Sequence, residues 1–184
     1  MARIRKFCAY RRIKPTPYTR ISKFKDMNFV KASPHISIVV FDMGNPNKKF
    51  DYEVDLIAKD NLQIRHQAIE SARMTCNRLL ETTLGKSGYC LKVRFYPFHI
   101  LRENPLAAGA GADRMSTGMA HSFGKPIGRA AQIRKGQVLF TLKVNKQNLE
   151  TAKKALKRAS YKFPCSCLIE SKELKQFKKL KEAE

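Results

Sequence analysis

Apolar and polar residues alternate along several short segments of the chain, which is the pattern of strands that bury one face. In residues 91–96 the alternating Lys92 and Arg94 give the predicted strand one basic face. The segment that contains Glu53 and Asp55 has one acidic face in the same way. The alternation predicts strands over residues 36–41, 52–58, 91–96 and 138–144, and shorter strands over residues 130–133 and 166–170.

Two other segments place apolar residues at steps of three and four, as α-helices with one buried face do. The first runs from a cap at Asp60 or Asn61 to a left-handed stop at Gly85. The second follows a cap at Asn145 or Asn148. It turns one set of residues inward, Leu149, Ala152, Leu156 and Ala159, and another outward, Lys153, Lys154, Lys157 and Arg158.

Strands and helices in this order predict a single α+β domain. We expect a two-layer sandwich, in which two helices pack on a mainly antiparallel sheet, over residues 1–170, and a charged tail over residues 171–184. A chain of 184 residues, 43% of them hydrophobic, is long enough to bury one core of ordinary size.

The segment over residues 102–126 has no strand or helix periodicity, and with the residues just beyond it holds five of the nine glycines of the chain. Compact domains seldom carry more than about 12 to 15 unstructured residues unless the loop has a function. We expect a long loop held at both roots by sheet. Its charged residues and those next to it are the cations Arg102, Arg114, Lys125 and Arg129, and the acids Glu103 and Asp113. Because the cations outnumber the acids, the loop is expected to approach an anionic surface.

The charge balance of the whole chain points the same way. There are 37 Lys and Arg against 15 Asp and Glu, which leaves a formal net charge of +22. Such a charge calls for a polyanion, of which nucleic acid is the first choice and a membrane surface the other. We expect no membrane span and no secretory signal, because no apolar run approaches the ~20 residues of a spanning helix.

Residues 1–34 form a basic arm. Ten basic residues and the single acid Asp26 are interleaved there with aromatic rings, and Pro15 and Pro17 favour extended backbone. Rings and guanidinium planes stack on exposed bases, and cations meet phosphates, so we interpret this arm as RNA-binding rather than as an idle solvated tail. We expect it to be disordered without RNA. The candidate RNA-binding residues are Arg3, Arg5, Lys6, Tyr10, Arg11, Arg12, Lys14, Tyr18, Arg20 and Lys23, together with Lys92 and Arg94 of the basic strand face.

The sequence predicts no catalytic residue, metal or cofactor. Arg114 stands where a dinucleotide-binding loop needs its third glycine, and Pro126 where a P-loop needs Ser or Thr. The four histidines are dispersed, and we place His66 on a helix surface. Five scattered cysteines indicate a reducing compartment, and the pair Cys165 and Cys167 lacks the second ligand pair of a zinc site. The alternative hypothesis is an RNA-modifying or RNA-processing enzyme that uses the loop as a substrate clamp.

The loop also carries a family resemblance. The sequence GADRMSTGMAHSFGKPIG, residues 111–128, resembles the signature of a universal family of large-subunit ribosomal proteins, called L-ten-e in archaea and eukaryotes and L-sixteen in bacteria. Further similarity lies in YRRIKPTPYTR (10–20), FDMG (41–44), VRFYPFHI (93–100) and KFP (162–164). The basic arm is similar to that of the archaeal and eukaryotic branch, and the archaeal branch is the closer of the two.

The resemblance implies an α/β-hammerhead type of fold and a structural role in the large subunit of the cytoplasmic ribosome, as a monomer beside neighbouring large-subunit proteins. It implies that the core and arm bind large-subunit rRNA, and that the loop points towards the peptidyl-transferase centre and the acceptor arms of tRNA. The loop residues carried over are Arg102, Asn104, Gly109, Gly111, Asp113, Arg114, Met115, Gly118, His121 and Lys125.

Overall fold

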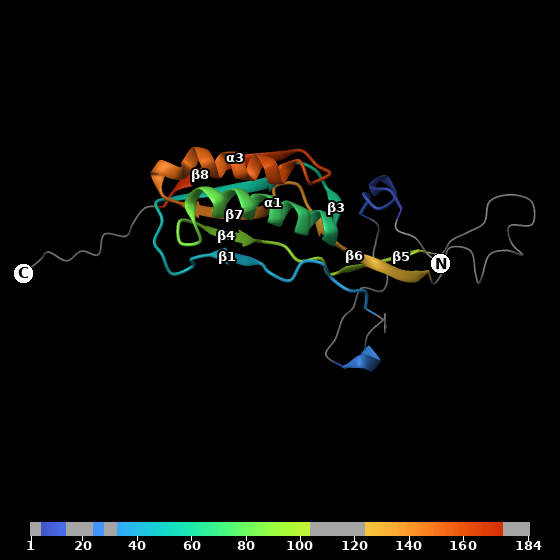
Figure 1. Cartoon of the computed structure of the whole chain (residues 1–184). Helices are drawn as coiled ribbons and strands as arrows, with labels where there is room; N and C mark the ends of the chain where they lie inside the picture. The colour runs from blue at the N-terminus through green and yellow to red at the C-terminus, as the bar shows by residue number, and fades with distance from the viewer. Residues whose placement is uncertain (1–4, 14–23, 28–32, 104–123, 175–184) are drawn as a thin grey trace, which may run out of the picture.

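The computed structural model describes residues 5–13, 24–27, 33–103 and 124–174 of the chain. In these segments two α-helices cover one face of a five-stranded sheet, and a three-stranded sheet extends from one end of that body (Figure 1). All strand pairs are antiparallel. The structure confirms the predicted α+β sandwich and adds a second sheet that the sequence pattern did not indicate.

The five-stranded sheet has the strand order β1-β4-β7-β2-β8. Its strands are β1 (Asp42–Gly44), β2 (Tyr52–Ala58), β4 (Cys90–Val93), β7 (Val138–Val144) and β8 (Cys167–Glu173). Leu91, Leu142 and Val54 lie opposite one another on the three central strands, and all three are fully buried. This apolar face of the sheet forms the main core with the helices.

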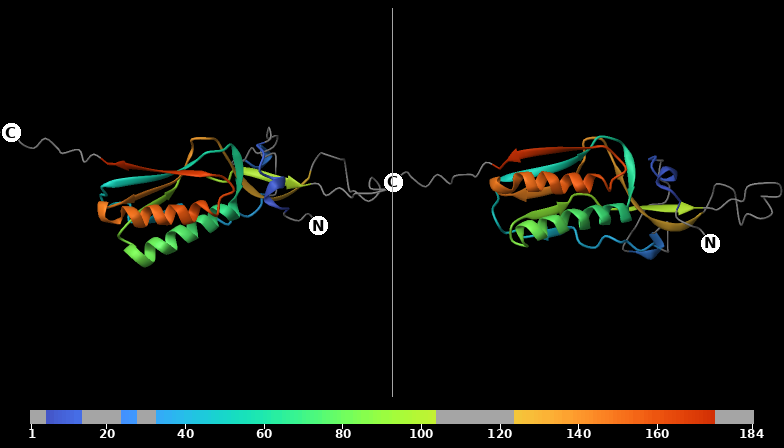
Figure 2. Two further views of the ribbon diagram at one scale, coloured as in Figure 1. Left: turned by 90° about the horizontal axis from the view of Figure 1, so that it is seen from above. Right: turned by 45° about the horizontal axis from the view of Figure 1, so that its top comes forward.

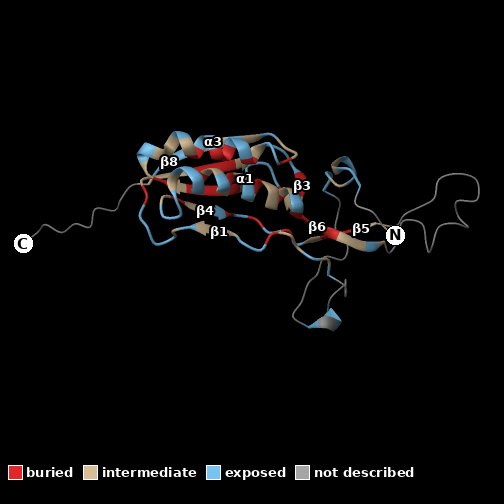
Figure 3. Ribbon diagram, viewed as in Figure 1, coloured by how far each residue is buried: buried red, intermediate tan, exposed pale blue. Residues whose placement is uncertain are grey.

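The helices α1 (His66–Leu84) and α3 (Leu149–Ser160) pack side by side on that face (Figure 2). Their buried sides face the sheet and their exposed sides face solvent (Figure 3). The fully buried residues are Ile69, Ala72, Cys76 and Leu80 of α1, and Ala152, Ala155, Leu156 and Ala159 of α3. These positions repeat at three- and four-residue steps, so the amphipathic pattern that predicted both helices is confirmed. Three short 3-10 turns complete the described elements, at Phe7–Ala9, Lys25–Met27 and Lys146–Asn148.

The three-stranded sheet has the order β3-β6-β5. Its strands are β3 (Leu62–Arg65), β5 (His99–Glu103) and β6 (Lys125–Ile133). Strands β5 and β6 pair as a ribbon whose last pair is Glu103 with Lys125. This pairing joins the two roots of the predicted loop, as expected. Strands β5 and β6 extend into the range 102–126 that was predicted as a loop, so Arg102 and Lys125 belong to the sheet. Residues 104–123 lie outside the described part of the chain.

Two expectations at the strand and helix boundaries are wrong. Residues 36–41 are not a strand: Ile38 is buried, but Val39 is 77% exposed, and pairing with β4 begins only at Asp42. The first helix begins at His66 rather than after a cap at residue 60 or 61, because residues 62–65 pair with β6. Leu62 and Ile64 alternate as in a strand, but Leu62 also lies at a helical spacing from Ile69, which extended the predicted helix too far towards the N-terminus.

Burial corrects the acidic face predicted for β2. Asp55 is only 5% exposed, and its carboxylate accepts a hydrogen bond from the Thr141 hydroxyl at 2.8 Å. Lys172 of the edge strand β8 lies 3.9 Å from the same carboxylate. Strand β8 pairs Glu170 with Asp55 and runs to Glu173, three residues beyond the predicted edge strand, which brings Lys172 beside the Asp55 carboxylate.

One expectation at a helix end and one on a strand face agree with the structure. Gly85 follows α1 with φ of 68°, and its N–H donates to the carbonyl of Glu81. Asn148 directly precedes α3, but its side chain makes no capping hydrogen bond, so the predicted cap is not confirmed. Along residues 91–96 buried and exposed side chains alternate at every position, although regular pairing in β4 ends at Val93.

Candidate nucleic-acid interface

Residues 5–13 of the basic arm lie against the three-stranded sheet. The backbone N–H of Gln63 in β3 donates to the carbonyl of Arg11 at 3.0 Å. The Gln63 side-chain amide donates to the carbonyls of Tyr10 and Arg12, at 3.1 Å and 2.6 Å. Gln63 is buried, so these bonds fix the arm backbone at the sheet surface. The expectation that the whole arm is disordered without RNA therefore does not hold for residues 5–13.

The same part of the arm is tied to the root of the predicted loop. The Tyr10 hydroxyl donates to Glu103 Oε2 at 3.2 Å and accepts the N–H of Arg5 at 3.1 Å. The Arg5 guanidinium forms an ion pair with Glu103, the last described residue before position 104. Burial, reinforced by the negative charge of Glu103, raises the pKa of Tyr10, so the phenol keeps the proton that it donates. Arm and loop root form one connected surface.

Arg65 completes this arrangement from strand β3. Its guanidinium lies over the Tyr10 ring, 5.7 Å from the ring centroid, and donates to the carbonyl of Arg5 at 3.0 Å. Gln63 and Arg65 are two residues apart in β3, so their side chains lie on the same face of the strand, and both bind the arm. These two residues were missed at the level of sequence because the helical pattern placed them in a helix; the strand-like alternation of residues 62–65 was the signal that could have found them.

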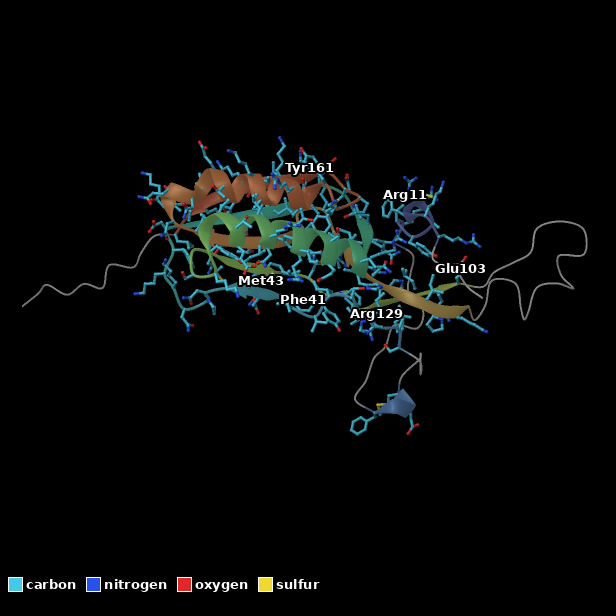
Figure 4. The ribbon with its side chains drawn as sticks, viewed as in Figure 1. Arg11, Phe41, Met43, Glu103, Arg129 and Tyr161 are labelled. Carbon is cyan, nitrogen blue, oxygen red and sulfur yellow. The ribbon has the colours of Figure 1, made fainter. Side chains whose placement is uncertain are left out.

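The docked arm leaves a group of cations in solvent. Lys6, Arg11 and Arg12 are exposed, and within the described segments their side chains have no acidic partner. The side chain of Arg11 is labelled in Figure 4. Lys125, at the start of β6, is exposed as well. We call these four residues and the Arg5 guanidinium the arm surface. Such an arrangement presents positive charge on a backbone that is already held in place.

Behind the arm surface, His66 and Arg129 are buried side chains that hold residues 33–41 on the body. The Nδ1 atom of His66 accepts the N–H of Ser37 at 3.0 Å. The Arg129 guanidinium donates to Ser33 and, at 3.5 Å, to the Tyr96 hydroxyl. The placement of His66 on a helix surface is wrong, because strand β3 leads directly into α1 and puts its first residue at the junction of the two sheets.

His66 predicts a pH dependence of stability. Burial, together with the positive charges of His35, Arg129 and Arg65, lowers its pKa, and its place in the first turn of α1 also disfavours a cation. The unfolded chain then binds more protons than the folded one just below about pH 6.5, the ordinary pKa of histidine. Stability is therefore expected to be full above that pH and to fall as the pH drops through it towards the lowered folded pKa.

Urea denaturation between pH 5 and 7.5 measures this dependence. His66→Gln is expected to flatten the profile, although burial lowers the pKa of His99 too and leaves part of the slope. The exposed His35 provides the control, and His35→Gln is expected to retain most of the slope of stability against pH. A wild-type profile without slope below pH 6.5 would contradict the prediction.

Lys92 and Arg94 lie on a different surface from the arm. They line an open groove of about 810 Å³ on the face of the five-stranded sheet that points away from the helices. Lys92 Nζ lies 3.5 Å from Asp42 Oδ1, and Lys143 Nζ lies 3.7 Å from Glu53 Oε2. These ion pairs reduce the net positive charge of the groove. The structure thus divides the predicted RNA-binding residues into two surfaces, of which the arm surface is the less neutralised.

Three buried polar atoms within the described residues have no hydrogen-bond partner, and all three belong to the three-stranded sheet. They are Gln63 Oε1, His99 Nδ1 and Arg129 Nε. Buried polar groups are nearly always satisfied in native proteins. Further contacts are therefore expected at this end of the molecule rather than at the five-stranded sheet.

The described predicted residues of the arm and loop roots, Arg5, Lys6, Tyr10, Arg11, Arg12, Arg102 and Lys125, gather at the three-stranded sheet. The other candidates lie outside the described residues: Arg3, Lys14, Tyr18, Arg20, Lys23, Asn104, Gly109, Gly111, Asp113, Arg114, Met115, Gly118 and His121. In the described segments no cluster of three or more His, Cys, Asp or Glu could hold a metal ion. Nor does any helix there have the length and apolar character to cross a membrane.

An α+β body that displays cations on a fixed arm, at the root of a strand ribbon, is the architecture of a protein that binds a polyanion. Comparison with known proteins identifies which kind. Residues 13–170 match the family described as ribosomal protein L16p/L10e, and the chain belongs to this family. Its members are structural constituents of the large subunit of the cytoplasmic ribosome and not enzymes, so the alternative of an RNA-modifying enzyme is not supported.

Similar curated proteins come from archaea. The chain is 44% identical over 160 residues to the large ribosomal subunit protein uL16 of Methanococcus maripaludis. The matched residues cover 87% of this chain and 89% of the relative. It is 43% identical over 159 residues to the protein of the same name from Staphylothermus marinus, with coverage of 86% and 88%. The predicted archaeal type agrees with these relatives.

Proposed function

We propose that the protein binds large-subunit ribosomal RNA through the arm surface. The relatives are named as large ribosomal subunit proteins, and the charge of +22 requires a polyanionic partner. The groove with Lys92 and Arg94 is a second, weaker candidate for RNA, because Lys92 and Lys143 of that groove already have carboxylate partners.

One observation carries this proposal: Arg11 and Arg12 of the arm surface are held in place by their backbone, and their side chains have no acidic partner among the described residues. Gln63 fixes the backbone of residues 10–12, while Arg11 and Arg12 extend into solvent. A segment that is already ordered before binding loses less conformational entropy when the complex forms. Phosphate contacts of such cations release counterions and make binding strongly dependent on salt.

We further propose that residues 104–123 extend this surface to the acceptor arms of tRNA near the peptidyl-transferase centre. The support is the family signature over residues 111–128 and the position of its roots beside the arm, where Glu103 bonds to Arg5 and Tyr10. Arg114, His121 and Lys125 are the proposed polar contacts. Crosslinks from Arg114 or Lys125 in assembled subunits test this part, and crosslinks confined to sites remote from tRNA would refute it.

The arm is tested by replacing Arg11 and Arg12 with alanine. Because both guanidinium groups are exposed, the fold is expected to be unchanged, while affinity for protein-free large-subunit rRNA at ~0.1 M salt falls roughly 10-fold to 100-fold. The slope of log affinity against log salt is expected to fall by about two, one for each phosphate that the variant no longer neutralises. Filter binding across a salt series measures both quantities.

The matched control for this test removes the same charge from helix α1 and the turn after it. Arg78 and Lys86 are exposed there, and Arg78→Ala with Lys86→Ala is expected to change the affinity much less than the arm variant does. Equal losses from the two variants would refute a specific role of the arm. Wild-type protein that ignores the RNA even at low salt would refute RNA binding altogether.

A further inference from the structure

The outer face of α3 is a second cationic surface, distinct from the arm. It carries the four exposed cations Lys153, Lys154, Lys157 and Arg158. Two more exposed lysines flank the helix, Lys146 in the turn before it and Lys162 after it. The only acid of α3 is Glu150 in its first turn. Because the opposite side of the helix is packed on the sheet, these side chains can only extend into solvent.

These cations have no ion pair in the described part of the chain, and neighbouring α1 provides the contrast. On the α1 side, Glu70 pairs with Arg73 at 2.5 Å and Glu81 with Lys86 at 3.7 Å. No carboxylate of the described segments lies within ion-pair distance of the α3 cations. Two helices of the same layer, each with one face open to solvent, therefore differ in how far their charges are paired. Exposure to solvent alone does not account for the difference.

The spacing of the cations carries a cost for the isolated protein. Lys153 and Lys157, like Lys154 and Arg158, are four residues apart and neighbours on the helix surface. Like charges at this spacing destabilise a helix. A polyanion bound along the face would turn this repulsion into attraction.

We propose that the outer face of α3 binds the phosphodiester backbone of a folded RNA helix. This inference rests on the proposed function, because it assigns a second site to the same RNA. The four cations of the helix lie within residues 153–158, about 8 Å along the axis at ~1.5 Å per residue, and Lys146 and Lys162 extend the set beyond both ends of α3. Recognition of double-stranded RNA works mainly through its shape and backbone, which an extended row of point charges suits.

Composition of the face favours RNA over an acidic protein. Lysine is depleted at protein–protein interfaces, where aromatic and apolar anchors dominate, but it is a regular binder of phosphate. The one large apolar side chain among the described residues at this face is Tyr161, 72% exposed at the C-terminal end of α3 (Figure 4). It lies in sequence between Arg158 and Lys162, where its ring can contact a sugar or stack on an unpaired base.

Lysine footprinting tests this surface in the unaltered protein. The full chain, free or bound to protein-free large-subunit rRNA, is acetylated briefly and its peptides are compared by mass spectrometry. Lys153, Lys154 and Lys157 are expected to lose reactivity several-fold in the complex, while Lys86 beside α1 retains it. If Lys6 of the arm is protected and the α3 lysines are not, the inference is refuted and the proposed function stands. If no complex forms at low salt, both fail.

A pair of variants with equal charge change provides the second test. Lys153→Gln, Lys154→Gln, Lys157→Gln and Arg158→Gln are combined in one protein, because glutamine preserves helix propensity. The control combines Arg78→Gln, Lys86→Gln, Arg134→Gln and Lys135→Gln, four exposed cations outside α3. Circular dichroism with thermal melting verifies that both proteins remain folded.

The α3 variant is expected to lose at least 10-fold in affinity for the RNA at ~0.1 M salt, and its salt slope is expected to fall by about three to four. The control is expected to lose much less. Equal losses would show that only net charge matters and would refute the inference. Protection of the α3 lysines in whole subunits, but not in the RNA complex, would identify a protein partner instead and refute the choice of RNA.

Discussion

Phe140→Ala is expected to lower the free energy of unfolding by about 3–5 kcal/mol, the usual cost of removing a buried aromatic side chain. Phe140 is 0% exposed on the central strand β7. Its ring meets the edge of Phe163 at 5.5 Å between centroids and stacks near Phe95 at 6.5 Å. Alanine would leave a cavity where strand β7, strand β4 and the segment after α3 meet, and the surrounding backbone is too well paired to collapse into it.

Urea denaturation of the purified protein measures this loss, and Phe98 provides a control with the same chemical change. Phe98 is 47% exposed, so Phe98→Ala is expected to cost less than about 1 kcal/mol. The midpoint for Phe140→Ala should fall without a large change in the slope of the transition. Losses of similar size from the two variants would contradict the position of Phe140 in the core.

The helix α3 and the strands β2, β4, β7 and β8 were predictable because their periodicity depends on burial within one element. Residues 91–96 alternate in the structure as they do in the sequence, and α3 buries the expected alanines and leucine. Strand β5 was not predicted, because Pro97 interrupts the alternation after residue 96, yet the chain begins a new strand two residues later in a different sheet. Proline interrupts one strand but does not prevent another.

The candidate site was predictable in its charges and not in its geometry. Arg11 and Arg12 were recognised as cations of an RNA-binding arm, but the side chains that position them are distant in sequence. Gln63 is 53 positions from Tyr10 in the sequence, and Glu103 is 93 positions from Tyr10. Glu103 was counted as a minor acid of the loop, whereas it is the residue that joins the loop root to the arm. Contacts of this range depend on the pairing of β3, β6 and β5, which local patterns do not reveal.

Gly44→Ala is expected to destabilise the protein by about 2–4 kcal/mol, through strain and a steric clash together. Gly44 has φ of 84°, and a Cβ atom there would lie 2.2 Å from the carbonyl oxygen of Tyr89. That oxygen accepts the N–H of Asn45 and belongs to the backbone beside β4, so it has little freedom to move. Gly136→Ala is the matched control, because φ is 83° there but no atom lies within 4 Å. It carries the strain alone, about 1–2 kcal/mol. Thermal melting of the two variants measures the difference in stability between them. Hydrogen exchange is expected to place the additional loss of stability of Gly44→Ala at β1. Equal losses of stability in the two variants would contradict the clash.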